Sequence, residues 1–218
     1  MAWNPAATRV TLLSTALLWA AAGCGGGGSR STDIRAPILL TIESDGARDG
    51  FVRSDGFTRT AGNQPGVGDL DAARLGLGLR MFYTFPLHRI PADAVITSVT
   101  LRVYQLGTHG LPFVDLGKLV VDHIDPGESL DAADYHGGTL DDDIGTLSHL
   151  FERNYASLAV EDNVKQDLEE GRPRSWFRLR FSRDSNLDGE TDVLNLNDGE
   201  NSRGLGNLPL LEVVYTRP

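Results

Sequence analysis

The sequence contains a single cysteine, Cys24, and no motif for nucleophilic catalysis. One cysteine excludes an intramolecular disulfide. There is no G-x-S-x-G elbow, and no H-E-x-x-H or similar metal-ligand spacing joins the five histidines. Bases are also few, with 20 against 30 acids and a net charge of −10. Because so acidic a surface repels phosphate backbones, nucleic-acid binding is not expected. No residue constellation supports an enzyme.

Glycine and proline are abundant, by contrast, with 25 and 10 residues scattered among short apolar segments. This pattern of glycine and proline between short apolar segments is typical of many short strands joined by turns. With 40% hydrophobic residues the chain can bury a core, and its length of 218 residues favours one domain.

Residues 1–23 predict a cleavable signal peptide. Arg9 precedes an apolar run over Val10–Gly23, which is shorter than the about 20 residues that a membrane-spanning helix needs. The run ends in Ala21-Ala22-Gly23-Cys24, which resembles the lipobox of bacterial lipoproteins. The resemblance implies that Cys24 is lipidated and becomes the new N-terminus. An ordinary secretory signal cut near Ala22 is the alternative.

Residues 24–35 predict a flexible tether that starts with Gly25-Gly26-Gly27-Gly28-Ser29. Several acyl chains form a stable anchor, at about 0.8 kcal/mol per buried methylene. By the rule of that family, Gly25 in place of aspartate after the cysteine favours the outer membrane of a Gram-negative host. We therefore expect a lipid-anchored protein of the cell envelope, on its extracellular or periplasmic face.

Residues 36–218 predict one all-β domain, an antiparallel β-sandwich with one or two short helices. Apolar and polar residues alternate with period two in several segments, which indicates sheets packed through a shared core. The alternating segments are Ile38–Ile42, Met81–Leu87, Val95–Val103, Phe177–Phe181 and Leu211–Tyr215. The Ser-Asp-Gly triplets that begin at Ser44 and Ser54 predict turns.

Three other segments complete the expected secondary structure. The spacing of Val160, Val164 and Leu168 predicts a short helix over about Val160–Glu170, ended by Gly171. Leu147–Arg153 predicts a second helical turn. The Gly-rich run between Gly62 and Gly78 predicts a long loop.

Three stretches together resemble a known family. They are Asp49–Gly56, Arg80–Leu87 running into Ile90–Tyr104, and Leu208–Tyr215. Their order is similar to that of the DNRLRE-type β-sandwich, the disaggregatase-related domain of bacterial and archaeal surface proteins. The most specific stretch is Ile90–Tyr104, which follows the pattern I-P-x-x-A-x-I-x-S. The resemblance implies a jelly roll, a fold on which some relatives bind carbohydrate.

Asp184, Asn186, Asp188, Glu190 and Asp192 predict a calcium loop. Oxygen-bearing side chains alternate around Gly189, as in D-x-N-x-D-G loops that wrap a hard cation. Because the preceding segment is strand-like, the calcium would be structural and bridge two strands. The alternative interpretation is an acidic Asx-turn without metal. Asp141-Asp142-Asp143 predicts a solvated loop, with a cation site or a sugar-contacting rim as the alternative.

The ligand of the domain is not encoded in a motif. A sugar-binding rim needs exposed flat aromatics, and the loops near Phe113 and Tyr135 are the candidates, with Phe57, Tyr104 and Tyr155 also open to exposure. His123, in an apolar strand, predicts a hydrogen-bonded core histidine. We expect a non-catalytic binding module, with glycan as the ligand class. The alternative is a structural envelope protein that acts through protein contacts.

Overall fold

The computed structural model describes residues 35–61, 66–70, 76–200 and 206–218. Arg35–Pro218 forms one structural unit. Cys24, the predicted lipid acceptor, and the predicted signal peptide lie outside the described residues. None of the helices in the described ranges is long and apolar enough to cross a membrane.

Strands dominate the part of the chain that the structure describes. Those strands are β1 (Ile38–Glu43), β2 (Gly50–Arg53), β3 (Thr58–Thr60), β4 (Gly66–Leu70), β5 (Gly78–Pro86), β6 (Val95–His109), β7 (Leu119–Ile124), β8 (Thr139–Ser148), β9 (Tyr155–Ala159), β10 (Arg174–Phe181), β11 (Thr191–Leu196) and β12 (Leu210–Thr216). The helical elements are η1 (Leu87–Arg89), α1 (Pro112–Asp115), η2 (Ala132–Tyr135) and α2 (Glu161–Glu169).

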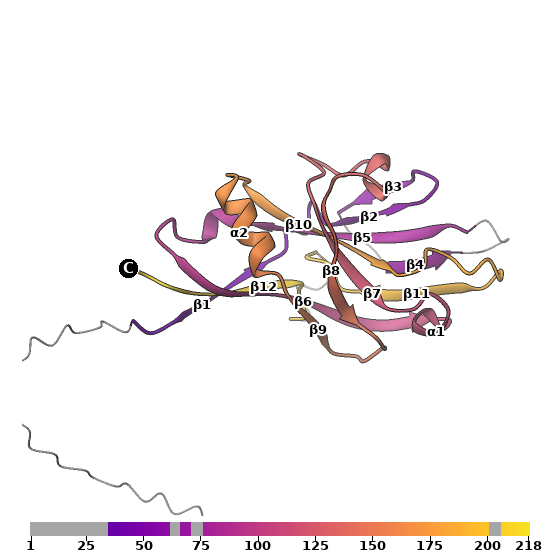
Figure 1. Ribbon diagram of the computed structural model, residues 1–218. Coiled ribbons are helices and arrows are strands. Elements are labelled where there is room, and N and C mark those ends of the chain that lie inside the picture. The colour runs from indigo at the N-terminus through magenta and orange to yellow at the C-terminus, as the bar shows by residue number, and fades with distance from the viewer. Residues whose placement is uncertain (1–34, 62–65, 71–75, 201–205) are drawn as a thin grey trace, which may run out of the picture. The chain divides into compact units, whose positions relative to one another are not determined.

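The strands form one curled antiparallel sheet in the order β1-β12-β6-β11-β4-β5-β10-β7-β8. The hairpin β2–β3 is added through β5, and β9 through β6. The long strand β6 contributes to both parts of the curled sheet. Its residues 95–104 pair with β12 and β9, and its residues 105–109 pair with β11 (Figure 1). The predicted all-β, sandwich-like antiparallel fold is confirmed.

The main core lies between the two layers of this curl. It contains Leu101 and Val103 of β6, Val213 of β12, and Tyr83 and Phe85 of β5, all fully or almost fully buried. These residues occupy alternate positions of their strands, as the period-two pattern predicts. Each fully buried side chain of this size stabilises the fold by about 1.5–3 kcal/mol.

The centre of the sheet is buried on both faces, however. The alternation of apolar and polar residues in the sequence predicted burial of one face only. Phe82 lies on the opposite side of β5 from the main core, in a second apolar cluster. The members of this cluster are Val52, Phe82, Ile124, Leu130, Tyr135 and Trp176. The segment around η2 covers this face, and Tyr135, predicted to lie on an exposed rim, is only 3% exposed. The prediction of a rim at Tyr135 is therefore wrong.

The local predictions had mixed outcomes. The helix predicted over Val160–Glu170 is confirmed as α2, with Val164 fully buried. Leu147–Arg153 is not helical, since it begins with the end of β8. The segment predicted as a long Gly-rich loop contains β4, and Asp141–Asp143 lies within β8 rather than in a loop.

Candidate functional site

The described surface contains a groove of about 750 Å³, which we call the β2–β11 groove. This volume is within the range of about 300–1,000 Å³ that small-molecule sites occupy. The hairpin β2–β3 forms one side, and the ends of β6 and β11 form the other. Its lining residues are Phe51, Arg53, Phe57, Arg59, Gly66, Leu70, Leu79, Leu106, Gly107, His109, Thr191, Val193, Asn195, Leu196 and Asn197.

An aromatic pair projects into the groove from the β2–β3 hairpin. Phe57 is 49% exposed, and its ring centroid lies 6.0 Å from that of the half-buried Phe51. The turn before Phe57 is the predicted Ser-Asp-Gly turn, where Gly56 has a φ of +90° that side chains disfavour. The turn is closed by bonds from the Gly56 amide to the Arg53 carbonyl and from the Arg53 amide to the Phe57 carbonyl. The turn thus keeps the Phe57 ring exposed to solvent.

Two guanidinium groups flank these rings. Arg53 donates Nε to Asp55 Oδ1 at 2.7 Å and Nη2 to Asp55 Oδ2 at 2.6 Å, and its Cζ lies 5.1 Å from the centre of the Phe57 ring. Hydrogen bonding between the two raises the pKa of Arg53 and lowers that of Asp55. Arg59 is exposed, and no residue in the described ranges forms an ion pair with it.

The far side of the groove supplies amides and an imidazole. Asn195 and Asn197 are at and beyond the end of β11, and His109 ends β6 with Nδ1 3.3 Å from the Thr191 carbonyl. The titratable residues that line the groove are therefore bases, although the whole chain carries a net charge of −10. A ligand with acceptor oxygens and negative charge complements this lining.

Three of the five residues of the predicted calcium loop, Asn186, Asp188 and Glu190, form hydrogen bonds with one another. Asn186 Nδ2 donates to Asp188 Oδ2 at 2.7 Å, and the Glu190 amide donates to Asp188 Oδ1 at 2.7 Å. The Glu190 bond is an Asx-turn bond of the kind given as the alternative, and the Asp188 amide makes another to Asn186 Oδ1 at 3.2 Å. Asp184 instead receives both its bonds from Arg80 Nη2 at 3.0 Å.

Asp192 is set apart from the rest of that loop by burial. Its carboxylate is 2% exposed at the start of β11 and accepts the Leu111 amide at 2.6 Å. Across the described ranges, no three acidic, histidine or cysteine side chains converge in a way that could hold a metal ion. The five residues that the sequence grouped thus contact different partners, and calcium binding stays a prediction.

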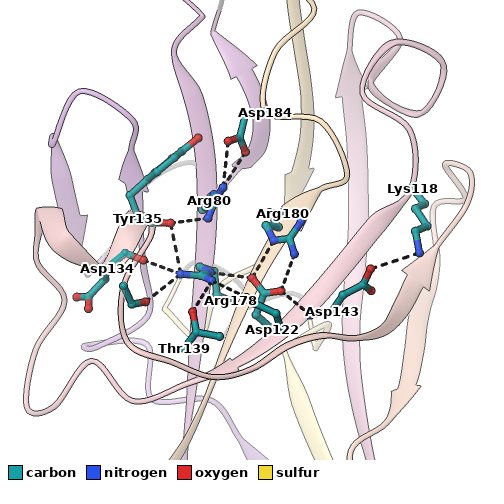
Figure 2. Close-up of polar contacts among 12 residues, drawn as sticks. Arg80, Lys118, Asp122, Asp134, Tyr135, Thr139, Asp143, Arg178, Arg180 and Asp184 are labelled. Carbon is teal, nitrogen blue, oxygen red and sulfur yellow. Dashed lines mark hydrogen bonds and ion pairs between the residues drawn. The ribbon is translucent and has the colours of Figure 1, made fainter.

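A buried arginine network accounts for many of the other charged residues (Figure 2). Arg178, 1% exposed, donates Nε to Asp122 Oδ2 at 2.9 Å and Nη1 to the carbonyls of Asp134 and Gly137 at 3.0 Å. Arg180 also bonds Asp122 through both oxygens. Burial alone would raise the pKa of Asp122, but hydrogen bonds from Arg180 and its other donors lower it. The network fastens the segment around η2 to the sheet, which is a structural role.

A second buried cluster contains the residue types of a catalytic triad in the wrong arrangement. Asp167 of α2 accepts from Arg172 at 2.9 Å and from the hydroxyl of Ser175, and lies 2.9 Å from His123 Nε2. Nucleophilic catalysis requires the serine to bond the histidine, whereas here both contact the same carboxylate. All three side chains are at most 1% exposed. His123 is confirmed as a hydrogen-bonded core histidine.

The groove was largely missed by the sequence analysis. Phe113, the other predicted rim residue, packs edge-on against Phe181 at 5.2 Å and is half-buried. Phe57 was only one of several aromatics open to exposure. A detectable signal was present, since Phe57 directly follows a Ser-Asp-Gly turn, where a core residue is not expected.

The chain matches no protein-family model, and a search of curated proteins finds no relative. The resemblance to DNRLRE-type domains is therefore carried only by the three stretches that suggested it, and it stays a prediction.

Proposed function

We propose that this chain is a non-catalytic binding module that takes an acidic glycan in the β2–β11 groove. The observation that carries the proposal is the lining of the groove, in which the exposed Phe57 and the half-buried Phe51 lie beside two guanidinium groups and the side-chain amides of β11 and the residue after it. Sugars offer an apolar C–H face and a rim of hydroxyl oxygens. An aromatic ring packs against the first, and guanidinium and amide groups bond the second.

The preference for acidic glycans is inferred from Arg59 and Arg53. The planar guanidinium group binds carboxylate and sulfate oxygens through paired hydrogen bonds. Arg53 is already bonded by Asp55, which fixes its position, whereas Arg59 keeps all its side-chain donors available among the described residues. Arg59 is thus the residue we expect to bond a charged group of the ligand.

The same proposal places the module outside the cytoplasm on a lipid anchor. It is supported by the residues Ala21–Cys24 and by the glycine tether that follows them. A binding domain on a flexible tether can reach a polymer some distance from the membrane.

Affinity electrophoresis in gels that contain polygalacturonate, dextran sulfate or neutral dextran tests this function. We expect the full-length chain to be retarded by an acidic polymer more than by dextran. Phe57→Ala and Arg59→Ala should each weaken the retardation by about tenfold in affinity, which corresponds to about 1.4 kcal/mol, the scale of one such contact.

Two control variants are matched in residue type and lie outside the groove. Phe151 is 38% exposed and Arg89 is exposed, and neither lines the groove. Phe151→Ala and Arg89→Ala should bind like the unmodified chain. Equal migration in all three gels, or equal losses in the groove and control variants, would contradict the proposal.

A further inference from the structure

The strand β1 differs from the strand at the other end of the sheet in how its edge is protected. Among the described strands β1 pairs only with β12, and it ends the sheet order on that side (Figure 1). At the opposite end, β8 carries Asp141–Asp143, an irregular register with β7 and a φ of +49° at Asp143, features that discourage pairing with another chain. Between Ile38 and Ile42, by contrast, β1 has no charge and no proline, and its register with β12 is regular.

The outward backbone groups of β1 follow from its pairing with β12. The Ser44 amide donates to the Pro209 carbonyl at 3.1 Å, and these two residues continue the register of the strand pair. Antiparallel strands bond through alternate residues, so the even-numbered residues of β1 bond β12. The amides and carbonyls of Leu39, Thr41 and Glu43 therefore point away from β12. No strand of the described ranges pairs with this outward side, which we call the β1 edge.

The β1 edge ends at Asp45, whose amide donates to the Thr84 carbonyl of β5 at 2.8 Å. A partner strand can thus lie beside β1 only as far as Glu43. The large side chains exposed along this stretch are apolar, with Leu39 61% and Ile38 42% exposed. Because neighbouring residues of a strand point to opposite faces, a strand that pairs with the β1 edge covers apolar side chains on both faces.

We propose that the β1 edge pairs antiparallel with the same edge of a second copy of this chain, about a two-fold axis at Leu39. In this register Leu39 of each copy bonds Leu39 of the other through both backbone groups. Ile38 of each copy lies opposite Leu40 of the other, which is packed against the main core. Arg35 lies opposite Glu43, so that opposite charges meet twice by symmetry.

The neighbouring register fits less well. Antiparallel pairing must bring outward-pointing residues opposite one another, so the next possible centre is Thr41. That register would place Leu39 opposite the charged Glu43, and Pro37 opposite Asp45, where β5 already occupies the edge. The register centred on Leu39 avoids both conflicts, and it places the Pro37 carbonyl where the Thr41 amide can donate to it.

This dimer does not depend on the function proposed above. None of the residues that line the β2–β11 groove belongs to β1. The contact is short, and we expect a weak dimer because its interface is at the small end of specific interfaces.

Sedimentation velocity of the full-length chain from about 5 μM to about 500 μM tests the association, since this range covers weak dissociation constants. We expect a monomer that converts to a dimer as concentration rises. Leu39→Lys places two ammonium groups side by side at the two-fold axis and should weaken dimerisation by about tenfold or more. Val114, on α1, is 76% exposed and lies outside β1 and β12, so Val114→Lys is the matched control and should associate like the unmodified chain.

Both variants keep residues 1–34, so any association through that segment is the same in each. A chain that stays monomeric at about 500 μM, or equal association of Leu39→Lys and Val114→Lys, would overturn the proposal.

Disulfide formation tests the register. Cα atoms of a hydrogen-bonded antiparallel pair lie about 5.5 Å apart, within reach of a disulfide. Leu39→Cys, combined with Cys24→Ser to remove the native thiol, should therefore form a covalent dimer on mild oxidation. Thr41→Cys in the same background places the two thiols about 13 Å apart along the paired strands and should cross-link far more slowly. Equal rates, or a faster reaction of Thr41→Cys, would show that the copies do not pair about Leu39.

Discussion

Replacement of Asp49 by asparagine is expected to flatten the dependence of stability on pH. The pKa of Asp49 is raised by burial to about 7 in the folded chain, against 3.8 for an exposed aspartate. Between these values the folded state keeps a proton that the unfolded state releases, so the free energy of unfolding falls as the pH rises. Each pH unit in this window is worth about 1.4 kcal/mol, which gives about 4 kcal/mol in all.

The variant separates this charge effect from the hydrogen bonds of the site. Asparagine is similar in size, but it replaces one acceptor oxygen with a donor, although Ser44, Thr84 and Gly199 all donate to the native carboxylate. The mismatch costs about 1 kcal/mol at every pH. Asp49→Asn should therefore be less stable than the unmodified chain near pH 4 and more stable above pH 7.

Urea unfolding followed by tryptophan fluorescence at intervals from pH 4 to pH 8 measures both curves. The difference between them isolates Asp49, because other titrating groups contribute equally to each. The two curves should cross within the window. Parallel curves, with a constant difference between pH 4 and pH 8, would refute the argument that Asp49 is buried without a compensating cation.

Three further predictions concern the rest of the fold. Arg178→Lys should lower the free energy of unfolding, measured by urea unfolding, by about 3 kcal/mol or more, because a lysine cannot replace the bonds to Asp122 and to two carbonyls. A loss of less than about 1 kcal/mol would contradict the role of the buried network. Gly68→Ala should lower the free energy of unfolding by about 3 kcal/mol in the same assay. Residue 68 has a φ of +137°, and the added Cβ would lie 2.1 Å from the Asp192 carbonyl oxygen. An unchanged stability would count against the pairing of β4 with β11. If the 184–192 loop binds calcium, the ion should raise the thermal midpoint by several degrees and Asp188→Ala should abolish the rise; identical midpoints with calcium and with chelator would exclude it.

The sequence was informative about the fold where local periodicity reports burial. Alternation located β1, β5, β6, β10 and β12, and four-residue spacing located α2. It failed at β4, where Gly66 and Gly68 are buried strand residues rather than loop residues. Glycine there allows close approach of β11, a long-range requirement that a local pattern does not contain.

The candidate site was harder to predict because its residues are distant in the chain. Arg59 lies in β3, His109 ends β6 and Asn197 directly follows β11, and the pairing of β11 with both β4 and β6 helps to bring these elements together. The acidic loop at 184–192 had a stronger local pattern. In the fold, however, Asp184, which lies beyond the end of β10, bonds Arg80, whereas Asp192 at the start of β11 bonds a backbone amide.

Mapping the binding surface by NMR tests the central claim most directly. Oligogalacturonate is titrated into the 15N-labelled full-length chain at pH 6, and the displaced amide resonances are assigned. The account predicts that shifts concentrate at residues 53–59, at His109 and at residues 195–197. Absence of shifts at millimolar sugar, or shifts concentrated around the smaller recess near Ser148 and Tyr155, would contradict it.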